Sequence, residues 1–218
     1  MPFDAVIFDM DGTLLDTEAM AVGAGLVTAE KMGYAISTAQ FEAMIGKDSD
    51  ATTQELARLG VKPADVARFK SEWGALFRLT ADNGIPVKPG VLALLNWLHD
   101  QKIPCAVATN SSEKGATLSL GSANLTDWFG AIIGYDMVAN PKPAPDVFLH
   151  AAECLGARPQ NCLAFEDSVL GCKAARAAGM TVVHVPDIVQ TAGSDAHFRA
   201  KTLLEGAEMA GLIPGAAL

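Results

Sequence analysis

The sequence predicts an α/β protein built on a parallel β-sheet, with an all-helical segment inserted after the first strand. The first observation is the apolar run Ala5–Phe8, which lacks alternation and is typical of a strand buried on both faces of such a sheet. The second is that the patterned segments between about residues 17 and 82 are all helical. The third is the alternation of strands and helices after residue 89, which indicates right-handed β-α-β units.

The inserted block contains stretches with the helical spacing of apolar residues, each ending in glycine. These stretches are residues 17–33, 38–46, 50–60 and 63–84. Two prolines and a glycine in "IPVKPG" then break the helical pattern. We therefore expect a Rossmann-like α/β core formed by residues 1–16 and 88–218, and an all-helical insert formed by residues 17–87.

The second half of the chain carries the remaining core elements. Proline near the start favours a helix over residues 89–101. Short apolar runs predict strands, and the segments between them predict helices. The strands are residues 104–110, 131–134, 161–167 and 181–185, and the helices are residues 111–124, 144–156 and 168–179. The tail from about residue 196 predicts one more helix.

Composition restricts the classes of function. The 218 residues are 50% hydrophobic, enough for a sizeable core, and the net charge of −9 argues against a nucleic-acid partner. No apolar run approaches the length of about 20 residues that spans a membrane, and the first ten residues do not resemble a secretion signal. Four cysteines without CxxC spacing indicate reduced, mostly buried thiols. We expect a cytoplasmic protein that is a monomer or a weak oligomer.

Polar side chains collect where the predicted strands end. Asp9 and Asp11 follow the first strand two residues apart, so an extended backbone would point both carboxylates to the same side. Six more polar residues lie at or near the ends of later strands. Taken singly, each could be a helix cap, a surface lysine or an acidic residue at a helix start. Taken together, they describe a pocket with carboxylates for a hard cation and with a lysine, a hydroxyl and backbone N–H groups for an anion. They are Thr109, Asn110, Ser111, Lys142, Glu166 and Asp167.

The order and spacing of these residues resemble the haloacid dehalogenase superfamily of phosphotransferases. "DMDGTLLDTE" is similar to its first motif, "ATNS" to its second, "KPAPD" around Lys142 to its third and "FEDS" to its fourth. The motifs cover nearly the whole chain, and the helical insert lies where the C1 cap of the phosphoglycolate phosphatase and β-phosphoglucomutase-like branch lies. Four ordered motifs at predicted strand ends are a far more specific signal than a lone pair of aspartates.

The resemblance implies an aspartyl-phosphate route. Asp9 would be the nucleophile and Asp11 the general acid–base residue. Mg²⁺ would be held by the side chains of Asp9 and Asp167 and by the backbone carbonyl of Asp11. Glu166 would orient waters or neighbouring groups, and Thr13 would order the turn and assist Asp11.

The resemblance also implies how a phosphate is held. Thr109, Lys142 and the backbone N–H of Asn110 would bind the transferring phosphoryl oxygens, because phosphoryl transfer depends on positioning and charge stabilisation. In the cap, Glu18 and Lys47 are polar residues that could face the substrate, although an exposed lysine needs no such explanation. No histidine shows metal-ligand spacing, and none is assigned to the site.

Three alternatives to a phosphatase fit these residues less well. A sugar phosphomutase similar to β-phosphoglucomutase would carry a histidine and an arginine early in the cap, and "EAMAVGAG" and "GKDSDATTQ" contain neither. A haloacid dehalogenase would lack the second acidic residue of the first motif, which is Asp11 here. A non-catalytic binding module would not need all four motifs intact. We therefore expect a Mg²⁺-dependent phosphatase that acts on a small phosphorylated metabolite, such as a sugar phosphate.

Overall fold

The computed structural model describes residues 2–45, 49–188 and 195–215. The chain divides into a core unit, Met1–Asp16 with Pro86–Leu218, and a cap unit, Thr17–Ile85. Residues 86 and 87 lie with the core rather than with the predicted cap. The reason is that the Asp16 N–H donates to the carbonyl of Pro86 at 2.8 Å and the Lys88 N–H donates to the carbonyl of Leu14 at 2.9 Å. These bonds attach the returning chain to the first motif.

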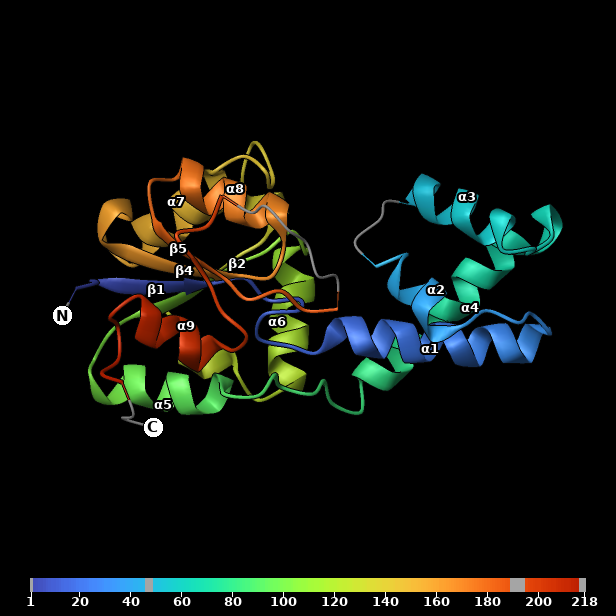
Figure 1. Cartoon of the computed structure of the whole chain (residues 1–218), viewed down its shortest axis with the longest axis horizontal. Coiled ribbons are helices and arrows are strands. Elements are labelled where there is room, and N and C mark those ends of the chain that lie inside the picture. The colour runs from blue at the N-terminus through green and yellow to red at the C-terminus, as the bar shows by residue number, and fades with distance from the viewer. Residues whose placement is uncertain (1, 46–48, 189–194, 216–218) are drawn as a thin grey trace. The chain divides into compact units, whose positions relative to one another are not determined.

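The core contains a parallel sheet of six strands in the order β3-β2-β1-β4-β5-β6, which confirms the predicted fold class (Figure 1). Almost every residue of its interior strands is buried, as expected for a parallel sheet covered on both faces. The strand bounds are β1 Ala5–Phe8, β2 Cys105–Ala108, β3 Ala131–Ile133, β4 Cys162–Glu166, β5 Thr181–His184 and β6 Phe198–Arg199. The two-residue strand β6 was not predicted, because its apolar pattern is too short to detect.

Helices cover both faces of the sheet, with α7 and α8 on one side and α5 and α9 on the other (Figure 1). Serine or threonine side chains cap α6, α8 and α9, as the N-termini of helices favour. The core helices are α5 Val91–Asp100, α6 Glu113–Ser122, α7 Asp146–Cys154, α8 Val169–Ala177 and α9 Leu203–Met209. Short 3-10 turns follow at η1 Thr126–Trp128, η2 Tyr135–Met137 and η3 Pro159–Asn161.

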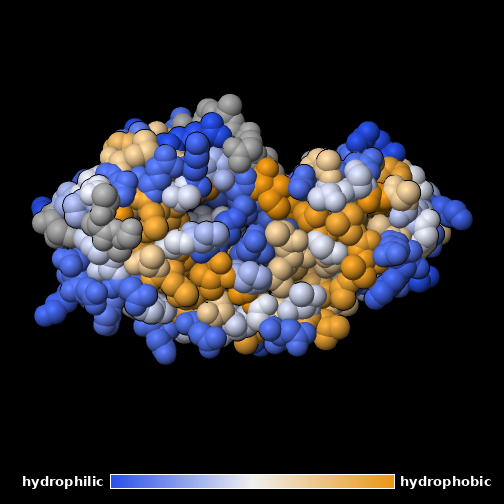
Figure 2. Space-filling model, turned by 60° about the horizontal axis from the view of Figure 1, so that its bottom comes forward, coloured by the Kyte–Doolittle hydropathy of each residue, from blue (hydrophilic) through white to orange (hydrophobic). Residues whose placement is uncertain are grey.

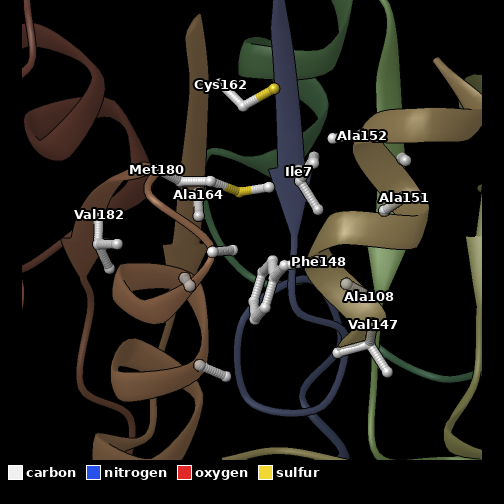
Figure 3. Packing of buried hydrophobic residues seen from close by; sticks show 14 of the residues in the cluster. Ile7, Ala108, Val147, Phe148, Ala151, Ala152, Cys162, Ala164, Met180 and Val182 are labelled. Atoms are coloured by element: carbon white, nitrogen blue, oxygen red, sulfur yellow. The ribbon is translucent and has the colours of Figure 1, made fainter. Parts of the chain in front are cut away.

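Side-chain alternation separates the two faces of the sheet. Under α7 and α8, small residues of the strands receive the larger Phe148 and Met180, so that the helices approach closely (Figure 3). On the other face, the rings of Phe8 and Phe165 stack with centroids 5.3 Å apart. This packing fixes the register of the strands, because a slip of one residue would turn every buried side chain to the wrong face.

Some apolar side chains are exposed on the surface, and most of the cysteines are buried. Leu118 is 65% exposed, and Figure 2 shows apolar residues interspersed with hydrophilic ones on the face in view. Three of the four cysteines are buried as expected, but Cys154 at the end of α7 is exposed. Within the described ranges, no helix combines the length and the apolarity that a membrane span requires.

The described part of the cap unit is helical, as predicted. Its centre is aromatic, because the rings of Phe41, Phe69 and Trp73 contact one another. The Trp73 indole N–H also donates to the carbonyl of Ala21 at 2.7 Å, which joins α4 to α1. The helices are α1 Thr17–Met32, α2 Thr38–Glu42, α3 Ser49–Arg58 and α4 Pro63–Ala81.

Two glycines of α1 predict opposite effects of the same substitution. A Cβ on Gly25 would lie 2.4 Å from the Phe41 ring, whereas a Cβ on Gly23 would meet no atom within 4 Å. Gly25→Ala should therefore lower the free energy of unfolding of the cap by about 1–2 kcal/mol through overpacking. Gly23→Ala should raise it by about 0.5–1 kcal/mol, because alanine favours the helix. Denaturant unfolding followed by circular dichroism measures both, and equal effects would contradict the α1–α2 packing.

Candidate active site

The site lies at the point where the chain reverses its direction across the sheet. Strand β1 lies between β2 and β4, so the connections on its two sides run in opposite directions. Ligands of open α/β sheets bind at such a position, beyond the C-terminal ends of the strands. Asp9 directly follows β1, Thr109 follows β2, and Glu166 ends β4 with Asp167 next. The fold therefore brings residues from three distant segments to one edge.

Lys142 is buried at the centre of the site and is not a surface lysine. Its ammonium Nζ donates to Asp9 Oδ1 at 2.6 Å and to Glu166 Oε1 at 2.6 Å. The side chain of Lys142 is 3% exposed. The Phe148 ring of α7 lies below the ammonium, 4.8 Å away, and adds a cation–π contact. One buried cation thus joins the nucleophile candidate of the first motif to the fourth motif.

Asn110 fixes the backbone that carries this lysine. Its Oδ1 accepts from the Lys142 N–H at 3.0 Å, and its Nδ2 donates to the Lys142 carbonyl at 3.3 Å. We expected only the backbone N–H of Asn110 to matter, so the side-chain role is a finding of the structure. Nearby, the Thr109 hydroxyl accepts from the Ser111 N–H at 3.0 Å, which orders the turn after β2.

Asp11 is held by Ser111, which the sequence places in the pocket without a role of its own. The Ser111 hydroxyl donates to Asp11 Oδ2 at 2.9 Å. This bond orients the carboxylate predicted to be the general acid–base group. Its position in the sequence points to the site, because Ser111 directly follows Thr109 and Asn110 in the second motif.

Both carboxylate oxygens of Glu166 have partners from the protein. Oε1 accepts from Lys142, and Oε2 accepts from the backbone N–H and the hydroxyl of Ser168 at 2.8 and 2.9 Å. A Cβ on Gly171 would lie 1.7 Å from Oε1, so only glycine fits this position of α8. Glu166 therefore joins Lys142 to the first turn of α8, and its part in orienting waters or neighbouring groups stays a prediction.

Three carboxylates form a candidate metal site. Oxygen atoms of Asp9, Glu166 and Asp167 all lie within 4.8 Å of one another. A Cβ on Gly12 would lie 2.5 Å from Asp167 Oδ2, so the glycine leaves room for that carboxylate. An all-oxygen donor set suits Mg²⁺, and Asp9 and Asp167 are the members whose expected role is ligation. The Asp11 carboxylate lies outside this cluster, so its predicted contribution remains that of its backbone carbonyl.

Burial dominates the electrostatics of the site. Burial raises the pKa of the Asp9 carboxyl to about 8, and Glu166 and Asp11 act in the same direction while Lys142 opposes them. For Lys142, burial alone would lower the pKa, but Asp9 and Glu166 outweigh it and the pKa is raised. The lysine is therefore a fixed cation, and a bound divalent ion would favour the ionised form of Asp9.

The remaining predicted residues stand apart from these contacts. Thr13 is buried, and its hydroxyl has no hydrogen-bond partner among the described residues, so the expected assistance to Asp11 is not seen as a direct contact. Glu18 lies half-buried in the first turn of α1 in the cap unit. Lys47 lies outside the described residues. His184, which we did not assign, donates from Nε2 to the carbonyl of Asp167 at 2.8 Å.

Comparison with known proteins finds sequence similarity over most of the chain. The family model described as haloacid dehalogenase-like hydrolase matches residues 6–185. The fructose-1-phosphate phosphatase YqaB of Escherichia coli is 36% identical over 189 residues, covering 84% of this chain and 96% of that protein. The phosphorylated carbohydrates phosphatase of Thermotoga maritima is 29% identical over 182 residues, covering 83% of this chain and 84% of that protein.

A solved structure is also similar to this chain over nearly its whole length. The HAD family hydrolase from Deinococcus radiodurans, solved with bound phosphate and sodium, superposes with a TM-score of 0.83 at 27% identity. The match covers 98% of each chain. That structure therefore has the fold of this chain over nearly its whole length.

The raised pKa of Asp9 predicts a pH dependence of stability. Between about pH 4 and pH 8, folded Asp9 keeps a proton that the unfolded chain has lost. Because the unfolded state then binds fewer protons, this group lowers the free energy of unfolding as the pH rises through that window. In EDTA, wild-type protein should lose thermal stability relative to Asp9→Asn between pH 5 and pH 8. Parallel melting temperatures across that range would contradict the assignment.

Proposed function

The chain belongs to the haloacid dehalogenase-like hydrolase family, and on that premise we propose that it is a Mg²⁺-dependent phosphatase. Its substrate is a small phosphomonoester, hydrolysed through an aspartyl-phosphate intermediate. The observation that carries the proposal is the buried contact between Asp9 and Lys142 beside the carboxylate of Asp167. This arrangement supplies a nucleophile, a fixed positive charge for a phosphate and oxygen ligands for a cation.

The first half of the reaction transfers the phosphoryl group to the protein. A carboxylate oxygen of Asp9 attacks phosphorus, and the bond from phosphorus to the leaving oxygen breaks. Protonated Asp11 gives its proton to that oxygen, so an alcohol leaves. The Lys142 ammonium and the Thr109 hydroxyl stabilise the negative charge on the phosphoryl oxygens. Bound Mg²⁺ would neutralise phosphate charge that otherwise repels the Asp9 carboxylate.

The second half releases inorganic phosphate. Asp11 is now a carboxylate and takes a proton from a water molecule that attacks phosphorus. The bond between phosphorus and the Asp9 oxygen breaks, and both aspartates return to their starting states. The Ser111 hydroxyl keeps the Asp11 carboxylate in one orientation for both proton transfers. Asp11 thus acts as the general acid in the first half and as the general base in the second.

The relatives favour a sugar phosphate as the substrate. Two of them are named for phosphatase activity toward fructose 1-phosphate and phosphorylated carbohydrates. The absence of histidine and arginine at the cap positions expected of a mutase favours hydrolysis over phosphoryl return to a sugar. Glu18 remains a proposed substrate-facing residue of the cap.

The catalytic roles are tested by substitution. Asp9→Asn should reduce turnover of p-nitrophenyl phosphate and fructose 1-phosphate to background, because an amide is not a nucleophile here. Lys142→Ala should lower kcat/KM by about 10²–10³-fold, the usual effect of losing one charge-stabilising donor. Lys173→Ala, which removes an exposed lysine of α8, is the matched control and should leave kcat/KM unchanged.

Circular dichroism of each variant separates loss of chemistry from loss of fold. Activity that survives in Asp9→Asn would rule out the covalent route, and an unchanged Lys142→Ala would show that the third motif is misassigned. Wild-type protein that hydrolyses no phosphomonoester of a broad panel with Mg²⁺, or that is equally active in EDTA, would reject the proposal. Conversion of β-glucose 1-phosphate to glucose 6-phosphate would favour the mutase instead.

A further inference from the structure

His184 occupies the same row of the sheet as two of the acidic residues. Glu166 of β4 is paired with His184 of β5, and Phe8 of β1 is paired with Phe165 of β4. Asp9 is therefore level with Glu166. Because residues level with one another in adjacent parallel strands project to the same face, Asp9, Glu166 and His184 form one row under α7 and α8. The histidine thus extends the row of site residues by one strand.

The imidazole makes a hydrogen bond at the point where the sheet ladder stops. The Val185 N–H donates to the carbonyl of Glu166 at 2.7 Å, and β4 ends there. The next carbonyl, that of Asp167, accepts from His184 Nε2 at 2.8 Å. Because a carbonyl oxygen can only accept, Nε2 carries the hydrogen. A side chain of β5 therefore secures the backbone of the residue whose carboxylate faces the candidate metal site.

The other ring nitrogen shows that this arrangement has a cost. His184 is 0% exposed, and its Nδ1 has no hydrogen-bond partner in the part of the chain that the structure describes. Burying a polar atom without a partner is unfavourable. An apolar side chain, such as those of Val182 and Val183 on the same strand, would avoid that cost. The bond to Asp167 is the contact that explains a histidine at this position.

We propose that His184 is a positioning residue for metal binding, which holds the backbone at Asp167 so that its carboxylate remains directed toward Asp9. The proposal rests on the metal site of the proposed function. His184 touches neither the metal nor the phosphate in this account. It acts through the main chain, in the way that outer partners of metal ligands commonly orient them.

The test measures Mg²⁺ binding without relying on activity alone. His184→Leu removes the donor, whereas His184→Gln places an amide N–H where it can still reach the Asp167 carbonyl. The thermal unfolding midpoint is recorded against MgCl₂ concentration at constant ionic strength, and the half-saturating concentration is compared with that for phosphatase activity. His184→Leu should raise both concentrations about 10-fold or more, the usual scale for losing such a partner. His184→Gln should restore most of the difference.

Val182→Ala is the matched control, because it trims a buried side chain on the same strand and the same face. It should lower the unfolding midpoint without moving the half-saturating Mg²⁺ concentration. A His184→Leu protein that is less stable but binds Mg²⁺ like wild type would overturn the proposal and leave the phosphatase intact. Failure of His184→Gln to recover Mg²⁺ binding would also overturn it. A wild-type midpoint indifferent to Mg²⁺ would reject the metal site and this proposal together.

Discussion

The contact of the buried Lys142 ammonium with Asp9 and with the carboxylate of Glu166 is the constraint on which the site depends. Removing one partner of a buried ion pair leaves an uncompensated charge, which costs about 3–5 kcal/mol. The three groups come from segments far apart in the sequence, so the two contacts join the ends of β1 and β4 to the loop before α7. The positive charge that would receive a phosphate is thus also a structural element of the unliganded protein.

The surrounding residues make this arrangement unique by limiting what else can fit. Asn110 holds both backbone groups of Lys142, and Ser168 holds the far oxygen of Glu166. Gly12 and Gly171 sit where any Cβ would collide with an acidic side chain. The small residues on the strands let α7 approach the sheet, and Phe148 of that helix lies against the lysine. Core packing and site geometry are therefore set by the same helix.

Much of the fold can be predicted from local sequence patterns, and most site residues can be predicted from their positions at the ends of strands. The apolar runs and glycine-terminated helices predict β1 to β5 and the cap helices, because periodicity and turn chemistry are local properties. Strand β6 escapes detection because it is two residues long. The motif residues are found because parallel strands deliver their ends to one edge. The contacts that Ser111, His184 and the Asn110 side chain make cannot be found from the sequence, because each depends on tertiary packing that no local pattern encodes.

The most direct test of the account is to observe the covalent intermediate. Wild-type protein mixed with Mg²⁺ and excess fructose 1-phosphate is quenched in acid within the first turnovers, digested and analysed by mass spectrometry. The account predicts the mass of one phosphoryl group on the peptide that contains Asp9, absent without substrate. Phosphate released at full rate with that peptide unmodified, or with the phosphoryl group on another residue, would contradict the central claim that Asp9 is the nucleophile.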